Sequence, residues 1–100
     1  MEPKADIRKL KITAYSSSHD ETDDTPDVTA SGTKTRPGVV AANFLPFGTK
    51  VRIPQLFGDR VFTVEDRMHS RFQDRLDIWF PTKQEARRFG LQFTEVEIEI

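Results

Sequence analysis

Lys9-Leu10-Lys11-Ile12-Thr13-Ala14 is the stretch that sets the fold class. Apolar residues stand at every second position in it, and the alternation belongs to a longer run from Asp6 to Tyr15. A period of two residues is typical of a strand with one face buried, because successive side chains of a strand point to opposite sides. The sequence therefore predicts a β-strand near the start of the chain.

Five further runs read as strands. Each is short, apolar or alternating, and bounded by turn-forming residues. They span residues 39–42, 50–53, 60–65, 76–80 and 93–100. In the last run the apolar set is Phe93, Val96, Ile98 and Ile100, and the charged face is Glu95, Glu97 and Glu99.

One short helix is expected after the fifth strand. Thr82-Lys83-Gln84-Glu85 has the spacing of a capping box, in which the threonine hydroxyl accepts an amide proton and the glutamate reaches back. Gly90 can adopt the left-handed conformation that ends a helix. The helix is therefore expected from Thr82 to about Gly90, and the fold class is all-β with this one helix.

Residues 16–35 are rich in Ser, Asp and Thr and carry hardly any large apolar group, so they predict a long polar loop. The whole chain of 100 residues is the size of one domain. Eight Phe and one Trp supply large side chains for a core although only 36% of the residues are apolar. We expect a single domain over residues 1–100.

Composition argues against several function classes. The 15 basic and 16 acidic residues nearly cancel, which makes nucleic acid an unexpected partner. Cysteine is absent and the two histidines are far apart, so we expect neither a disulfide framework nor a metal site, and no cofactor is indicated. No apolar run is long enough to cross a bilayer, so no membrane span is expected in this chain.

Two carboxylates stand out by their context. Asp66 follows the strand that ends in Phe62-Thr63-Val64, and Asp77 lies within Arg75-Leu76-Asp77-Ile78-Trp79-Phe80. Burial among apolar groups raises the pKa of a carboxyl towards values useful for proton transfer. The alternation alone favours a plainer arrangement, in which Leu76 and Ile78 face the core and Asp77 faces water.

Short segments along nearly the whole chain follow the pattern of one known family, in the same order. They are Thr13-Ala14-Tyr15, Thr29-Ala30-Ser31-Gly32, Val40-Ala41-Ala42-Asn43, Leu45-Pro46-Phe47-Gly48-Thr49-Lys50-Val51, Val64-Glu65-Asp66, Arg75-Leu76-Asp77-Ile78-Trp79-Phe80 and Glu85-Ala86-Arg87-Arg88-Phe89-Gly90. This pattern resembles the 3D domain, a family named for three aspartates and similar to the catalytic barrel of membrane-bound lytic transglycosylase A and to stationary-phase survival proteins. The resemblance implies a six-stranded double-psi β-barrel, which agrees with the six runs described above.

The resemblance also implies roles for individual residues. It places the catalytic acid on Asp77 and the second aspartate on Asp66. The position of the first aspartate is Asn43 in this chain, and the glycine-rich turn that usually follows the second is replaced by Arg67-Met68-His69-Ser70. Asparagine can donate and accept hydrogen bonds but cannot act as a general base.

Substrate contacts are expected from Asn43 and from three other polar residues. Thr29 and Ser31 could bond sugar hydroxyls, and Tyr15 could stack on a sugar face, as Trp79 could. Turn formation by the hydroxyls and packing by the aromatic rings are equally open explanations. His69 is a further candidate proton carrier beside Asp66, although a loop histidine is more often simply exposed.

The expected function is therefore that of a lytic transglycosylase, which cleaves β-1,4 bonds between N-acetylmuramic acid and N-acetylglucosamine and leaves 1,6-anhydro-muramoyl ends. The expected partner is the glycan strand of peptidoglycan, and the resemblance implies export to the cell wall or periplasm, although the chain begins with no signal peptide. Two alternatives stay open: a barrel that binds peptidoglycan without cleaving it, and a domain for protein interaction. The sequence leaves the oligomeric state open.

Overall fold

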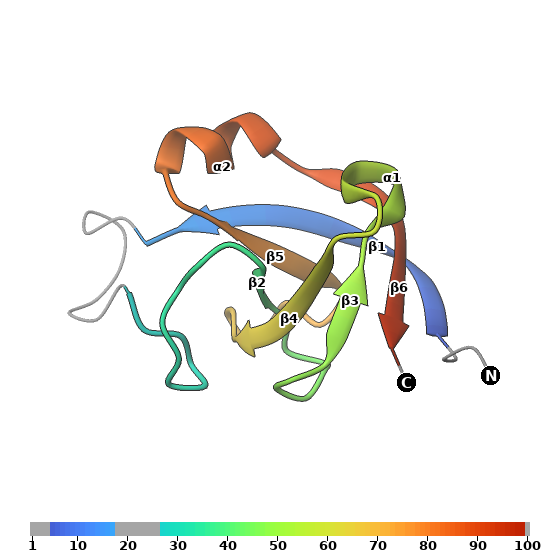
Figure 1. Ribbon diagram of the computed structural model, residues 1–100, viewed down its shortest axis with the longest axis horizontal. Helices are drawn as coiled ribbons and strands as arrows, with labels where there is room; N and C mark the ends of the chain where they lie inside the picture. The colour runs from blue at the N-terminus through green and yellow to red at the C-terminus, as the bar shows by residue number, and fades with distance from the viewer. Residues whose placement is uncertain (1–4, 18–26, 100) are drawn as a thin grey trace.

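The computed structural model describes residues 5–17 and 27–99. These residues form six strands and two helices, which follow one another as shown in Figure 1. The strands are β1 (Ala5–Ser16), β2 (Val39–Ala41), β3 (Lys50–Arg52), β4 (Val61–Asp66), β5 (Arg75–Phe80) and β6 (Gln92–Glu99), and the helices are α1 (Pro54–Phe57) and α2 (Lys83–Phe89).

The strands close into a barrel in the order β1-β5-β2-β4-β3-β6. Two neighbouring pairs are parallel, β1 with β5 and β2 with β4, and the other pairs are antiparallel. Parallel neighbours require crossover connections, so strands distant in the sequence lie side by side. The closed six-stranded arrangement, with its two parallel pairs, confirms the predicted double-psi β-barrel.

The interior of the barrel is apolar and contains side chains from all six strands. Residues in it alternate along the strands with residues on the outer face, as the sequence pattern predicts: Leu76 is 0% exposed and Ile78 is 1% exposed, with Asp77 between them on the other face. The buried cluster consists of Leu10, Ile12, Val40, Ala42, Val51, Ile53, Phe62, Val64, Leu76, Ile78, Val96 and Ile98.

Helix α1 was not predicted. Pro54 stands in its first turn, where a missing N–H is tolerated. The ring of Phe57 meets Phe62 edge-on at 5.1 Å between centroids and stacks with Phe89 at 6.0 Å. The helix is only one turn long, and these aromatic contacts rather than intrinsic helix propensity hold it in place.

Helix α2 starts as predicted. The backbone N–H of Glu85 donates to Oγ1 of Thr82 at 3.1 Å, and the Thr82 hydroxyl donates to the Glu85 carboxylate at 3.0 Å. The Glu85 carboxylate therefore accepts a hydrogen bond from the side chain of Thr82. In the predicted capping box it would accept one from the backbone N–H of Thr82. Gly90 ends the helix at φ 65°. The helix packs against β1 and β5 (Figure 1).

The last strand corrects one detail of the sequence pattern. Phe93 was grouped with the apolar set, but its side chain is 64% exposed and lies on the charged face, while Thr94 is buried in its place. Phe93 is an odd-numbered residue and Val96 and Ile98 are even-numbered, so the period of two puts them on opposite sides. Ile100 lies outside the described residues.

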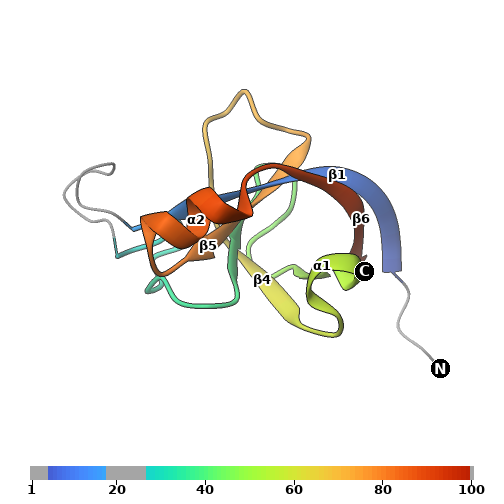
Figure 2. The same cartoon turned by 90° about the horizontal axis from the view of Figure 1, so that it is seen from above.

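The polar loop expected at residues 16–35 is described in part. Strand β1 includes Ser16, and residues 27–35 form a compact turn with a bridge between Val28 and Lys34. Residues 18–26 lie outside the described residues. The connection between β4 and β5 stands away from the barrel, as Figure 2 shows. No helix in residues 5–17 and 27–99 is long and apolar enough to cross a membrane.

Candidate functional site

Four residues from four strands form one row across the outside of the barrel. Thr13 of β1 is paired with Asp77 of β5, Asp77 is paired with Ala41 of β2, and Ala41 is paired with Asp66 of β4. Paired residues of neighbouring strands share a face of the sheet. The row therefore brings the two aspartates singled out in the sequence to the same part of the surface, on either side of the small side chain of Ala41.

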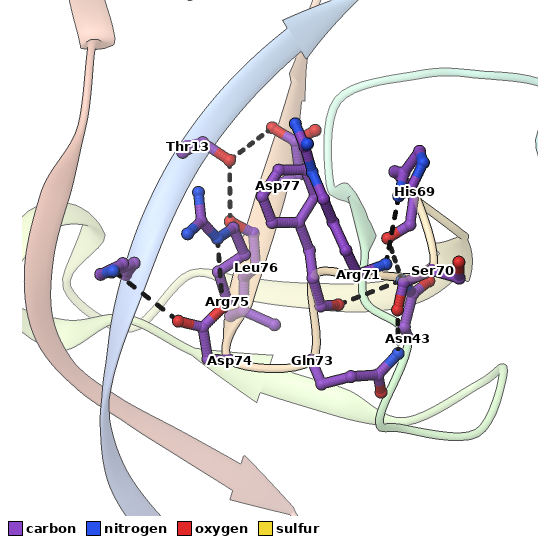
Figure 3. Close-up of polar contacts among 12 residues, drawn as sticks. Thr13, Asn43, His69, Ser70, Arg71, Gln73, Asp74, Arg75, Leu76 and Asp77 are labelled. Carbon is purple, nitrogen blue, oxygen red and sulfur yellow. Dashed lines mark hydrogen bonds and ion pairs between the residues drawn. The ribbon is translucent and has the colours of Figure 1, made fainter.

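Asp77 lies on the outer face but is only partly exposed. The hydroxyl of Thr13 donates a hydrogen bond to Oδ1 of Asp77 at 2.9 Å (Figure 3). Burial raises the pKa of the Asp77 carboxyl to about 6, and the charge of Asp66 adds to this effect, whereas the Thr13 hydrogen bond and the charge of Arg75 lower it. A carboxyl with this pKa can hold or release a proton near neutral pH.

Both oxygens of the Asp66 carboxylate are engaged. Oδ1 accepts the backbone N–H of Ala30 at 2.8 Å and that of Arg67 at 2.9 Å, and Oδ2 accepts the hydroxyl of Tyr15 at 2.8 Å. These donors come from β1, from the turn at residues 27–35 and from the start of the β4–β5 connection. Asp66 is therefore held in one orientation by three separate segments of the chain.

Tyr15 was predicted to stack on a sugar face. In the structure its hydroxyl donates a hydrogen bond to the Asp66 carboxylate. Burial raises the pKa of the Tyr15 phenol, and the charge of Asp66 and its hydrogen bond raise it further. The phenol thus stays protonated and serves as a hydrogen-bond donor at physiological pH. Trp79, the other aromatic candidate, is paired with Tyr15 in the parallel register and donates its indole N–H to Oγ of Ser17 at 2.8 Å.

Asn43 was predicted to contact substrate, but its amide is committed to the protein. Its Nδ2 donates to the carbonyl oxygens of His69 at 2.8 Å and Phe72 at 3.1 Å, and its Oδ1 accepts the N–H of Met68 at 3.0 Å. Both amide protons are therefore used, and an aspartate here could not replace them. Asn43 therefore holds the β4–β5 connection through the backbone of His69, Phe72 and Met68.

Three arginine side chains in and next to the β4–β5 connection stack on aromatic rings. Arg71 and Arg75 both lie against the ring of Phe72, with Cζ at 4.7 Å and 4.3 Å from its centroid, and Arg67 lies 3.8 Å from the centroid of Phe47. Figure 3 draws Arg71 and Arg75 in the same group of side chains as Asp77, and the charge of Arg75 acts on the Asp77 carboxyl. The candidate proton carrier His69 is exposed, and its Nδ1 accepts the N–H of Arg71.

Thr29 and Ser31 belong to the turn that supports Asp66. Thr29 is buried, and its hydroxyl, which was predicted to contact substrate, bonds within the turn to Ser31 and Thr33. The Ser31 side chain is exposed, and its backbone N–H donates to the carbonyl of Glu65. The turn contacts the site through Ala30, the residue between Thr29 and Ser31, whose backbone N–H donates to Asp66.

Thr13 and the Ala30 N–H were missed as site groups from the sequence. Thr13 stands 64 residues before Asp77, and only the parallel register of β1 and β5 brings the two together. The one available signal was that Thr13 and Tyr15 are two residues apart on a strand and so share a face. The role of Ala30 involves only its backbone, which leaves no trace in residue type.

Other features bear on what the site can hold. Three surface cavities are defined in the described part of the chain, and Asp66 and Asp77 line none of the three, although Tyr15 lines one. Within the described ranges, no group of three or more metal-ligating side chains comes together. A scan against protein-family models and a search of curated proteins found no match to this chain.

Proposed function

We propose that this domain acts on peptidoglycan as a lytic transglycosylase, with Asp77 as its acid and base. The observation that carries the proposal is the row from Thr13 through Asp77 and Ala41 to Asp66, in which one partly buried carboxyl lies near a second that is fixed in place. The substrate class comes from the resemblance to the 3D domain, which implies that Asp66 and Asp77 take the places of two of the family's aspartates.

The proposed reaction uses a single proton. Asp77 gives its proton to the glycosidic oxygen between N-acetylmuramic acid and N-acetylglucosamine, and the bond from that oxygen to the anomeric carbon breaks. The Asp77 carboxylate then takes the proton of the muramoyl 6-hydroxyl, whose oxygen bonds to the anomeric carbon. A 1,6-anhydro ring forms, Asp77 is protonated again and no water is consumed.

The hydrogen bonds to Asp66 favour a reaction in which Asp77 alone acts as acid and base. Most glycoside hydrolases use their second carboxylate as a nucleophile or to activate water. Here three donors occupy the oxygens of Asp66, which leaves it poorly placed for either role. Its negative charge is suited instead to raising the pKa of Asp77 and to stabilising positive charge that develops on the sugar ring.

Thr13 can serve both protonation states of Asp77. Its hydroxyl lies 2.9 Å from Oδ1 of Asp77 and 3.3 Å from the carbonyl oxygen of Leu76, and it has one proton to give. When Asp77 is ionised, Thr13 donates to it. When Asp77 is protonated, Thr13 can donate to Leu76 and accept from the acid, so that neither state leaves an unpaired group.

The test is mass spectrometry of purified murein sacculi after digestion by the wild type and by Asp77→Asn. We expect anhydromuropeptides from the wild type and a loss of at least about 100-fold in the variant, because general acid–base catalysis contributes about 10²–10⁴-fold. Asp74→Asn is the matched control, since Asp74 is exposed and pairs with Lys11 and Arg75. Equal release by the wild type and Asp77→Asn would refute the proposal.

A second candidate is a barrel that binds peptidoglycan without cleaving it. Asn43 favours this candidate, because the position at which the resemblance expects the first aspartate holds an amide whose protons are already used. Sedimentation with insoluble sacculi separates the two candidates. Retention of the wild type with no soluble product selects the binding module.

A further inference from the structure

A cavity of about 190 Å³ lies between the end of β1 and helix α2. Its lining consists of Ala14, Tyr15, Ser16, Lys83, Ala86 and Arg87. At about 30 Å³ for each molecule of liquid water, this volume equals about six waters, which suits a group the size of an amino acid. None of the roles proposed above for Asp66 and Asp77 uses this cavity.

The helix side of the cavity is positively charged. Lys83 and Arg87 are four residues apart on α2, a spacing that puts both side chains on one face of a helix. Arg87 is exposed and forms no ion pair with another residue in the described ranges. A guanidinium can bind a carboxylate through two hydrogen bonds.

The strand side of the cavity consists of Ala14, Tyr15 and Ser16. Ser16 is 5% exposed, and its Oγ has no hydrogen-bond partner among residues 5–17 and 27–99. A buried hydroxyl without a partner is uncommon and costs stability. Ala14 of β1 and Ala86 of α2 give the cavity an apolar portion.

Tyr15 connects the cavity to the aspartate pair. It lines the cavity, and its hydroxyl donates to Asp66. The negative charges of Asp66 and Asp77 both act on Tyr15, whereas the cations of α2 are on the cavity side. A ligand with an anionic group and a neutral sugar would be oriented by this separation of charge, its anion held by α2 and its sugar next to the aspartates.

We infer that this cavity is a subsite for a carboxylate-bearing peptide substituent on the glycan strand. A carboxylate carries one negative charge, which the Arg87 guanidinium can balance, and the methyl groups of Ala14 and Ala86 can contact the apolar part of an amino acid. The inference rests on the proposed function, because it takes the sugar beside Asp66 and Asp77 to be the one that carries the peptide.

The test is an amide NMR titration of the ¹⁵N-labelled full chain with N-acetylmuramoyl-L-alanyl-D-isoglutamine. Uncharged N,N′-diacetylchitobiose is the ligand control, because it has N-acetylated sugars but neither the peptide nor a carboxylate. We expect the muramoyl dipeptide to shift the amides of Ala14, Ser16 and Arg87, and the uncharged disaccharide to leave them unchanged.

Arg87→Gln removes the positive charge, and Arg88→Gln is its matched control because Arg88 lines a different cavity. An exposed ion pair contributes up to about 1 kcal/mol, so we expect Arg87→Gln to raise the Kd of the dipeptide by roughly fivefold and Arg88→Gln to change it less than twofold. Equal affinities of the wild type and Arg87→Gln, or no dipeptide binding at the cavity, would overturn the subsite.

This outcome is separable from the fate of the proposed function. The titration is repeated in the Asp77→Asn background, where no cleavage is expected. Dipeptide binding that depends on Arg87, with no cleavage of sacculi by the wild type, would keep the subsite and refute the transglycosylase. Cleavage by the wild type, with dipeptide binding that does not depend on Arg87, would support the transglycosylase and refute the subsite.

Discussion

The hydroxyl of Thr13 lies 2.9 Å from Oδ1 of Asp77, across the parallel pair of β1 and β5. This contact opposes the effect of burial, because a hydrogen bond to the ionised carboxylate lowers the pKa of Asp77 while loss of hydration raises it. Burial is the larger of the two effects, and the pKa comes to about 6.

Thr13→Val is expected to raise the pKa of Asp77 above about 6, since it removes a hydrogen bond that favours the charged form. The pKa is measured by ¹³C NMR titration of the aspartate carboxyl carbons. Cleavage activity, where present, should extend to higher pH in the variant because the acid holds its proton longer. Thr13→Ser keeps the hydroxyl and should titrate like the wild type. An unchanged or lower pKa in Thr13→Val would contradict this account.

Asp77→Asn is expected to stabilise the fold at neutral pH. The pKa of Asp77 is raised from 3.8 to about 6 in the folded state, so the folded protein binds the proton more tightly than the unfolded chain. Stability therefore falls as the pH rises from about 4 to about 6, and the penalty is complete above that range. Removing the charge should increase the free energy of unfolding by about 1–3 kcal/mol at pH 7.5.

Urea denaturation at several pH values measures this gain, which should shrink towards pH 4. Asp74→Asn is the control of opposite sign. The hydrogen bond from Arg75 lowers the pKa of exposed Asp74, so its contribution is present at neutral pH and is lost as the pH falls. A stabilisation by Asp77→Asn that did not vary with pH would show that its charge is not the cause.

Tyr15→Phe is expected to destabilise the protein by about 1.5–3 kcal/mol, the usual range for a hydrogen bond to a charged group. The substitution keeps the ring and removes only the donor to Oδ2 of Asp66. Guanidinium denaturation measures the loss. Phe93→Leu, at an exposed position on β6, should change stability by less than about 0.5 kcal/mol. A Tyr15→Phe protein as stable as the wild type would show that the Tyr15 hydrogen bond to Asp66 does not stabilise the fold.

Asn43→Asp introduces the residue type that the resemblance to the 3D domain implies at this position and is expected to destabilise this chain. It removes two donated hydrogen bonds, to the carbonyls of His69 and Phe72, at a cost of about 1–3 kcal/mol in total. Hydrogen exchange of the Met68 amide, which donates to Oδ1 of Asn43, measures whether the β4–β5 connection is released. Unchanged Met68 protection in Asn43→Asp would show that the connection is held by other contacts.

The barrel could be predicted from the sequence because its strands have one face in the core and therefore a period of two. The positions of Asp66 and Asp77 at and within strands were also readable. Helix α1 was not, since Pro54-Gln55-Leu56-Phe57 is too short to show a helical period and depends on contacts with Phe62 and Phe89. The roles of Thr13 and Asn43 depend on the register of parallel strands and on backbone carbonyls, and neither is encoded locally.

The row from Thr13 to Asp66 takes one residue from each of four strands, and its paired residues lie 25 to 64 residues apart in the chain. The partners are joined only after loops of tens of residues have closed, and such closure is slow relative to local structure formation. During refolding, the unusual titration of Asp77 should thus appear together with completion of the barrel and not before it.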